Sequence, residues 1–389
     1  MITSPKGFVA NGVHCGIKED PAALDLSLVA TDDHQPVAAA GVFTSNKATA
    51  APVNVSKSHL IATGGHASAV ILNSGNANAA TGAQGESDAK RMAALVASAL
   101  GCDPTAVLVC STGLIGIPLP IDPVEAGIAP LAQELSANSA GATRAADAIL
   151  TTDTVRKVTL IEGNGFSVGG MAKGAAMLAP NMATMLAVLT TDAAVDPDML
   201  QSALAEAVAR SFNEMTIDGC TSTNDTVLVF ASGRAGAPDP SDFRQALADT
   251  CADLSRQMVA DAEGATKLAT VSITGAASHE DARRAARKIA ESQLVKCSLF
   301  GADPYWGRIV SEIGSAGIEF DINSLSVSYG NVTVCANGMA ATHDESKLRT
   351  HLHGRDVEIS ADLGLGSGTA TILTADLTPD YIDENMRTS

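Results

Sequence analysis

The chain has 389 residues, a formal net charge of −18 and 3% aromatic residues. A polyanion would be repelled by this charge, and few aromatic side chains are present for base stacking, so we expect no nucleic-acid partner. Apolar residues make up 46% and charged residues 17%. This composition indicates a globular protein of two or three packed subdomains rather than a disordered chain.

Residues 1–21 lack a basic stretch followed by an apolar one, and no apolar run approaches ~18 residues. We therefore expect a cytoplasmic protein without a secretion signal or a membrane span. The seven cysteines are scattered and form no C-x-x-C pair, which predicts reduced, mostly buried thiols. His351 and His353 are the closest histidine pair, but their polar surroundings favour solvated surface, and we expect no metal site.

Spacing of apolar residues and end signals predict four helices, over residues 87–100, 196–212, 239–261 and 279–291. The first ends at Gly101, a plausible left-handed terminator. The second follows Asp196 as an N-cap and has Pro197 in its first turn. The fourth follows Ser278 in a sequence close to a capping box.

Runs of β-branched and apolar residues predict strands over 157–162, 185–190, 226–231 and 267–274. The last third of the chain is richer in strands. Residues 325–336 contain a Gly-Asn turn, and residues 357–376 are predicted to form a hairpin around glycines. Residues 163–181 and 232–242 look the most flexible. Together these elements predict an α+β fold, a layered sandwich with mixed sheets.

Thr184 lies where a loop-like stretch meets an apolar run that begins at Met185. If the bond between Ala183 and Thr184 is cut, Thr184 becomes an N-terminal residue. Its own α-amine, with a pKa of about 7.7–8.0, can then serve as the base that a threonine nucleophile needs. The ordinary alternative is that Thr184 is a β-branched residue that starts a strand.

A second candidate lies in residues 107–120, where an apolar strand runs into Ser111, Thr112 and Gly113. A hydroxyl beside a glycine N–H at a strand end can form an oxyanion hole. The alternative, an ordinary strand and turn, is favoured if this stretch is judged alone. The chain has no P-loop, no G-x-S-x-G and no H-E-x-x-H, and "GLGSG" at 364–368 has the wrong spacing for a dinucleotide loop.

Nine stretches are specific when taken together: "GVFTSNKATAAPV" (41–53), "ILNSGNANAATG" (71–82), "CSTGLIG" (110–116), "TTDT" (151–154), "GGMAKGAAMLAPNMATML" (169–186), "DGCTSTNDTV" (218–227), "DAEGATK" (261–267), "LFGADPYWGRI" (299–309) and "YIDEN" (381–385). With them the chain resembles, over nearly its whole length, the glutamate N-acetyltransferase family. This family is also called ornithine acetyltransferase and acts in arginine biosynthesis.

The resemblance implies chemistry of the N-terminal-nucleophile type. The chain would cut itself into an α subunit, residues 1–183, and a β subunit, residues 184–389. Thr184 would be the nucleophile, and Thr112 and Gly113 the oxyanion donors. The implied substrate-binding residues are Thr151, Lys173, Thr184, Glu263, Asn385 and Ser389. An ammonium such as that of Lys173 suits a substrate carboxylate and a carboxylate such as that of Glu263 suits a substrate ammonium, although either could be a solvated or helix-end charge.

Two departures from the family pattern stand out. The family usually has Asn where this chain has Tyr305. The tail "NMRTS" is one residue shorter and lacks the usual tyrosine, so Thr388 competes with Ser389 for the role of closing the pocket.

The resemblance further implies a reaction that moves acetyl from N-acetylornithine to glutamate, in an α2β2 heterotetramer without a cofactor. Acetyl-CoA stays open as a second donor. A related self-cleaving aminopeptidase or amidase, which sends the acyl group to water, is the alternative enzyme. A non-catalytic binder on the same fold would require loss of Thr184, Thr112 or Gly113, and all three are present.

Overall fold

The computed structural model describes residues 1–179 and 185–386, and they form two compact units. The first unit comprises Met1–Asn213 and Cys220–Met258, and the second comprises Glu214–Gly219 and Val259–Ser389. The predicted boundary at 183/184 concerns cleavage of the chain rather than compactness, and it stays a prediction. Ala183, Thr184, Thr388 and Ser389 lie outside the described residues.

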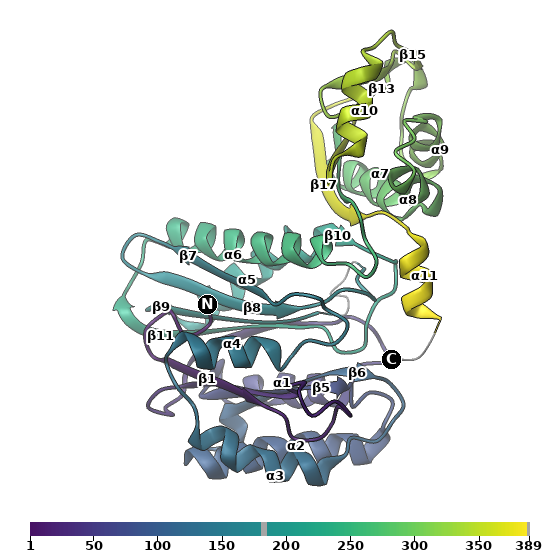
Figure 1. The fold of residues 1–389 in the computed structure, drawn as a ribbon. Coiled ribbons are helices and arrows are strands. Elements are labelled where there is room, and N and C mark those ends of the chain that lie inside the picture. The colour runs from purple at the N-terminus through teal and green to yellow at the C-terminus, as the bar shows by residue number, and fades with distance from the viewer. Residues whose placement is uncertain (180–184, 387–389) are drawn as a thin grey trace. The chain divides into compact units, whose positions relative to one another are not determined.

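The first unit contains two mixed sheets (Figure 1). The larger has the order β4 (His66–Ala67), β3 (Val37–Phe43), β11 (Thr226–Gly236), β9 (Leu186–Ala193), β8 (Ser167–Lys173), β7 (Lys157–Glu162). The smaller has the order β1 (Phe8–Val13), β2 (Leu26–Thr31), β5 (Ala69–Asn76), β6 (Val107–Leu114). β9 is parallel to β11 and β5 is parallel to β6, while the other pairs are antiparallel.

These two sheets pack face to face and share one apolar core, which includes Leu72, Leu108, Val188 and Leu228. Helices cover the outer faces, so the unit is a helix–sheet–sheet–helix sandwich (Figure 1). Its helices are α1 (Ala51–Ala62), α2 (Gly82–Leu100), α3 (Ile121–Gln133), α4 (Ser139–Asp147), α5 (Pro197–Ala209) and α6 (Pro240–Ala260), with short 3-10 turns at Pro104–Ala106 and Phe212–Glu214.

The second unit is built on a seven-stranded mixed sheet. Its order is β10 (Met215–Thr216), β17 (Gly368–Ala375), β12 (Leu268–Ala276), β16 (Asp356–Asp362), β13 (Ser326–Tyr329), β14 (Val332–Ala336), β15 (Met339–Ala340). The helices are α7 (His279–Glu291), α8 (Gln293–Phe300), α9 (Gly307–Ser315), α10 (Glu345–His353) and α11 (Pro379–Asn385), with a 3-10 turn at Ile322–Ser324. An apolar core of its own joins sheet and helices.

The predicted fold class and helices are confirmed. The stripe of residues in α6 is fully buried, since Phe243, Leu247, Cys251, Leu254 and Met258 are 0% exposed. The carboxylate of Asp196 and the hydroxyl of Ser278 accept N–H groups at the starts of α5 and α7. Gly101 ends α2 with a left-handed φ of 73°. This helix begins at Gly82, five residues earlier than its apolar spacing indicates.

The hairpin predicted over 357–376 is wrong. β16 and β17 do not pair with each other, because β12 lies between them, parallel to β16 and antiparallel to β17. The connecting residues bond to the end of β12 instead: the N–H groups of Leu365 and Gly366 donate to the carbonyl of Gly275. Local sequence marks the two strands and the turn, but a strand from elsewhere in the chain decides their pairing.

The flexible stretch predicted over 163–181 is also wrong in part, because residues 167–173 form the buried strand β8. Its two adjacent glycines lower strand propensity. They are needed because a Cβ on Gly169 would lie 2.2 Å from the carbonyl oxygen of Met1. Close backbone approach therefore outweighs local propensity here.

Three of the seven cysteines are buried, two are partly buried, and Cys220 and Cys297 are exposed. No disulfide joins them within the part of the chain that the structure describes. Among the same residues, none of the helices combines the length and apolar character that crossing a membrane requires.

Candidate active site

The predicted oxyanion residues lie near the end of strand β6 in the first unit. Thr112 is only 3% exposed, and Gly113 follows it with a φ of +129°. A Cβ on Gly113 would lie 2.2 Å from the backbone carbon of Gly75 on the neighbouring strand, so only glycine fits. The side-chain amide of Asn224 donates to the carbonyl oxygens of Ser111 (2.9 Å) and Ala77 (2.6 Å), which holds this strand end in place.

Lys173, the last residue of β8, reaches the same place. Its side chain is buried, and its Nζ donates to the hydroxyl oxygen of Thr112 at 3.4 Å. Because that oxygen accepts from an ammonium, the hydroxyl hydrogen of Thr112 can be donated elsewhere, and hydrogen bonds in such a chain strengthen one another. The pair therefore presents a donor suited to a developing negative charge.

Asp153 links Lys173 to the predicted substrate residue Thr151. Its carboxylate accepts the backbone N–H of Thr151 at 3.1 Å and that of Gly174 at 2.7 Å, and it pairs with Lys157 Nζ at 2.6 Å. Lys173 Nζ lies 3.9 Å from the same carboxylate. Burial alone would raise the pKa of Asp153, but the charges of Lys173 and Lys157 and these hydrogen bonds lower it to about 2. An ionised Asp153 thus fixes the Thr151 loop against β8.

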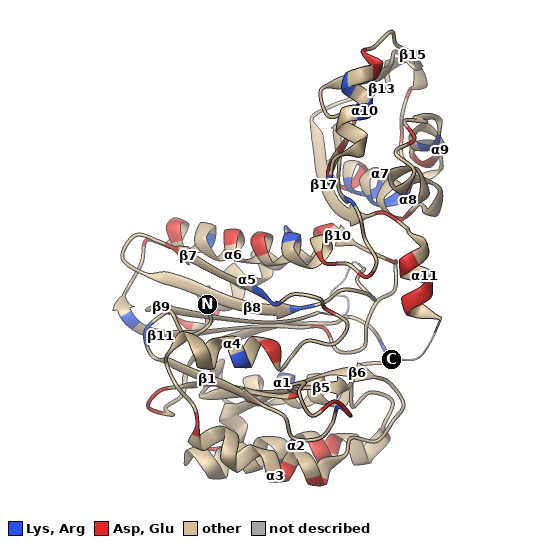
Figure 2. Cartoon of the chain, in the orientation of Figure 1, with Lys and Arg blue, Asp and Glu red and all other residues tan. Residues whose placement is uncertain are grey.

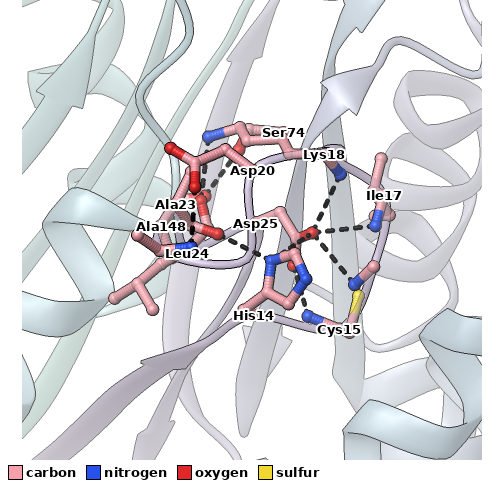
Figure 3. A network of polar contacts seen from close by, with 12 residues as sticks. His14, Cys15, Ile17, Lys18, Asp20, Ala23, Leu24, Asp25, Ser74 and Ala148 are labelled. Carbon is pink, nitrogen blue, oxygen red and sulfur yellow. Dashed lines mark hydrogen bonds and ion pairs between the residues drawn. The ribbon is translucent and has the colours of Figure 1, made fainter.

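A second buried carboxylate supports the same region from the N-terminal segment (Figure 3). Asp25 accepts backbone N–H groups from Cys15, Gly16, Ile17 and Lys18 at 2.6–3.1 Å. Burial would raise the pKa of Asp25, but these N–H donors lower it below its usual range. The four donors wrap residues 15–18 around one carboxylate, which is a nest-like arrangement.

The side chain of Lys18 connects this nest to the residue before Thr151. Its Nζ donates to the carbonyl oxygens of Leu24 (2.8 Å) and Leu150 (2.7 Å), and Leu150 directly precedes Thr151. A Cβ on Gly75 would lie 3.0 Å from Ile17, so the same segment also backs the strand beside Gly113. Burial lowers the pKa of Lys18. The Asp25 nest therefore positions both the oxyanion turn and the Thr151 loop.

The remaining described candidates, Glu263 and Asn385, lie in the second unit. The Nδ2 of Asn385, at the end of α11, donates to the Glu263 carboxylate at 2.7 Å, and Glu263 is 8% exposed. α11 itself is acidic (Figure 2). Glu263 lines a partly open cavity of about 570 Å³ together with Asp218, Glu291, Lys296, Asp376 and Tyr381. Four carboxylates and one lysine favour a ligand that carries a cationic group.

Lys296 is the one cationic side chain among the residues that line this described cavity. Its Nζ donates to the hydroxyl of Thr374 at 2.9 Å and to the carbonyl of Ala375. Burial lowers the pKa of Lys296 to about 8, although the charges of Asp218 and Asp376 act in the opposite direction. Lys296 therefore stays mostly protonated near pH 7, and the cavity is negative because four carboxylates face this single ammonium.

The structure thus brings together Thr112, Gly113, Lys173 and Thr151 in one unit, and Glu263 with Asn385 in the other. The sequence analysis missed Asp153, Lys18 and Asp25. Asp153 stands inside the quoted stretch "TTDT", so its position was a usable signal, whereas Lys18 and Asp25 carry no local mark. Within the described residues no group of three or more His, Cys, Asp or Glu side chains is placed to hold a metal ion.

Comparison with known proteins gives a consistent result. Residues 9–388 match the model of the ArgJ family. The chain is 45% identical over 385 residues to the arginine biosynthesis bifunctional protein ArgJ of Thermobifida fusca, covering 99% of this chain and 98% of that one. It is 48% identical over 391 residues to the protein of the same name from Mycobacterium tuberculosis, covering 99% of this chain and 95% of that one.

A crystal structure of ornithine acetyltransferase from Mycobacterium tuberculosis, complexed with ornithine, is 43% identical and has a TM-score of 0.42. It covers 46% of this chain and 94% of that one. With a family model matched from residue 9 to residue 388 and relatives at 45–48% identity over nearly their full length, the chain belongs to the ArgJ family.

Proposed function

We propose that this protein is an acyltransferase of arginine biosynthesis that moves the acetyl group of N-acetylornithine to glutamate through Thr184. The observation that carries the proposal is the contact between Lys173 and Thr112, beside Gly113, at the end of two strands. It assembles a donor for a developing oxyanion next to a lysine that suits a substrate carboxylate. Membership of the ArgJ family, whose relatives are named for arginine biosynthesis, supports the same reaction.

The first half-reaction begins after self-cleavage frees the α-amine of Thr184. The Thr184 hydroxyl attacks the acetyl carbonyl of N-acetylornithine, and the α-amine takes the hydroxyl proton. Thr112 and Gly113 donate hydrogen bonds to the oxyanion of the tetrahedral intermediate. The bond to ornithine breaks, its amine takes the proton from the Thr184 ammonium, and an acetyl ester remains on Thr184.

In the second half-reaction glutamate enters, and its amine attacks the acetyl ester. The α-amine of Thr184 takes the proton that the attacking nitrogen loses and passes it to the Thr184 oxygen as that oxygen leaves, and N-acetylglutamate departs. Both acceptors are α-amino acids that differ at the distal group, so Lys173 can hold a carboxylate common to both. We also propose that Thr151, Glu263, Asn385 and Ser389 bind substrate, with Glu263 meeting the substrate ammonium.

A donor assay with and without glutamate tests this reaction. Release of ornithine that depends on glutamate, parallel lines in double-reciprocal plots and a gain of about 42 Da on the β subunit alone when glutamate is withheld would support acetyl transfer through an ester. Intersecting lines and no acetylated β subunit after rapid quenching would mean direct transfer between bound substrates. Release of ornithine and acetate without glutamate would instead identify a self-cleaving amidase.

The same preparation tests the finer proposals. Acetyl-CoA offered as the donor would reveal the second acetylation activity, for which the word "bifunctional" in the relatives' names is the support. We also propose an α2β2 heterotetramer acting in the cytoplasm. Native mass and subunit composition of the active protein check the assembly.

A further inference from the structure

The cavity that Glu263 lines in the second unit contains a lysine to which the proposed reaction gives no role. Lys296 lies on α8, is only 5% exposed, and lines the same cavity of about 570 Å³. This volume is typical of a site for a small molecule. All the residues that line the cavity belong to the second unit, so its wall forms within one compact body.

The ammonium of Lys296 is held by two neutral acceptors. Its Nζ donates to the hydroxyl of Thr374 at 2.9 Å and to the carbonyl of Ala375. The Thr374 hydroxyl in turn donates to the carbonyl of Ala290 at 3.1 Å, which fixes its orientation. An ammonium has three N–H donors, so within the described residues one donor of Lys296 is left for a ligand. A buried charge of this kind is costly unless an opposite charge meets it.

Two of the four carboxylates in the cavity wall already have partners that belong to the fold. Asp376 accepts the backbone N–H of Thr266 at 2.9 Å and its hydroxyl at 2.5 Å. Glu291 lies 3.5 Å from the guanidinium of Arg287 on the same helix. These two carboxylates therefore serve the structure of the second unit, and Glu263 is the carboxylate that the proposed function assigns to the substrate.

The two substrates of the proposed reaction carry opposite charges at the ends of their side chains. The side chain of N-acetylornithine ends in an ammonium and that of glutamate ends in a carboxylate, the same number of bonds from Cα. Both exchange the acetyl group at the α-nitrogen, so in a shared site their side chains enter one distal subsite in turn. Carboxylates alone would attract the ammonium and repel the carboxylate of glutamate. Such a subsite therefore needs a cation beside its carboxylate.

We propose that this cavity is the distal subsite for both substrates, where Glu263 accepts the side-chain ammonium of N-acetylornithine and Lys296 donates to the side-chain carboxylate of glutamate. The inference rests on the proposed acetyl transfer. Lys296 is the one cationic side chain among the residues that line this described cavity, so it is the source of positive charge there. Burial lowers the pKa of Lys296 only to about 8, so the ammonium form predominates near pH 7. Lys296 thereby determines which acceptor is used.

The test compares kcat/KM for glutamate and for glutamine as acceptors, because glutamine has nearly the same shape but an uncharged distal amide. The wild type should prefer glutamate by about 10–100-fold, the usual effect of one hydrogen bond to a charged group. This preference should largely disappear in Lys296→Met, while KM for N-acetylornithine should not rise. Lys267→Met is the matched control, because Lys267 Nζ donates to the carbonyl of Gly354 at 2.8 Å and is not among the residues that line the cavity. It should keep the wild-type preference.

Equal kcat/KM for glutamate and glutamine in the wild type would overturn the inference without any variant. An unchanged preference in Lys296→Met, or an equal loss of preference in Lys267→Met, would also overturn it. If Lys296→Met does not fold, Lys296→Gln, whose amide can donate to a neutral acceptor but carries no charge, decides by the same criteria.

The first half-reaction separates this inference from the proposed function. Without glutamate, N-acetylornithine should still add about 42 Da to the β subunit of Lys296→Met, because the donor carries no distal carboxylate. Loss of that gain in Lys296→Met alone would overturn the inference and show a general structural role for Lys296. Absence of the gain in the wild type would overturn the proposed acetyl transfer itself.

Discussion

The ammonium of Lys173 lies 3.4 Å from the hydroxyl oxygen of Thr112, although 61 residues separate them in the chain. Lys173 ends β8 in one sheet and Thr112 lies near the end of β6 in the other. The face-to-face packing of the two sheets in the first unit therefore creates the contact. It places a buried positive charge behind a hydroxyl that can donate to a developing oxyanion.

Self-cleavage is the first prediction, since the proposed chemistry needs the free α-amine of Thr184. The wild-type protein should yield chains of 183 and 389 − 183 = 206 residues, while Thr184→Ala should stay one chain of 39.4 kDa. Intact-mass analysis measures both. Full activity in a wild-type preparation that remains one chain would contradict the prediction.

Thr112→Ala should lower turnover by about 10²–10³-fold, the usual effect of removing one oxyanion donor. Self-cleavage should be measured in the same variant, and turnover scored on the cleaved fraction. Thr105→Ala serves as the matched control, because its hydroxyl only bonds the exposed Asp103 at 2.6 Å. Near-wild-type turnover in cleaved Thr112→Ala would show that this strand end has only an ordinary structural role.

Asp153 should make stability depend on acid pH. Its folded pKa of about 2 lies below the usual value of 3.8, so its stabilising contribution is present above 3.8 and is lost as pH falls toward 2. The loss should be on the order of 2 kcal/mol in the free energy of unfolding. Asp153→Asn should lack this step, and urea unfolding at several pH values measures the difference.

The comparison for Asp153 is Asp147→Asn, which removes a half-exposed pair with Arg156. Exposed ion pairs contribute about 0–1 kcal/mol, so this variant should follow the wild-type curve closely. The free energy of unfolding could instead change with pH in the same way for the wild type and for Asp153→Asn. That result would show that the two lysines do not lower the pKa of Asp153.

Lys18→Met should raise KM for N-acetylornithine more than it lowers kcat. The methionine side chain fills similar space but leaves the carbonyl oxygens of Leu24 and Leu150 without their donor, which loosens the segment before Thr151. A buried acceptor left unpaired costs about 1–3 kcal/mol, so Tm should also fall. Lys90→Met, which removes an exposed helix pair with Glu86, should change neither quantity. An unchanged KM in Lys18→Met would show that the Asp25 nest does not contribute to substrate binding.

Glu263→Gln should weaken binding of the substrate that carries a free ammonium. Hydrogen bonds to a charged partner contribute about 1.5–3 kcal/mol, which corresponds to a rise of about 10–100-fold in KM for N-acetylornithine. Asn385 can still donate to the amide oxygen that this substitution leaves at position 263, so the fold should be preserved. Glu312→Gln, which alters a carboxylate 3.9 Å from Lys288, is the control. Equal KM values in the two variants would show that Glu263 does not bind the substrate.

The helices, the fold class and part of the candidate site could be predicted from the order of the amino acids. The stripe from Phe243 to Met258 predicts α6 because helical periodicity is a local property, and Asp196 and Ser278 mark helix starts through side chains that bond within one turn. The roles of Thr112, Gly113 and Lys173 follow from the resemblance of their motifs to those of a known family. Whether Thr184 acts as proposed awaits the cleavage and transfer experiments.

Which of these residues meet depends on tertiary packing, which no local pattern contains. Pairing of β12 between β16 and β17 replaced the predicted hairpin, since strand partners are chosen by non-local packing. β8 forms in spite of its glycines because another segment approaches its backbone closely. Asp153 and Asp25 gain their roles from N–H groups and charges that folding brings to them, and the motif around Asp153 marks its position but not these partners.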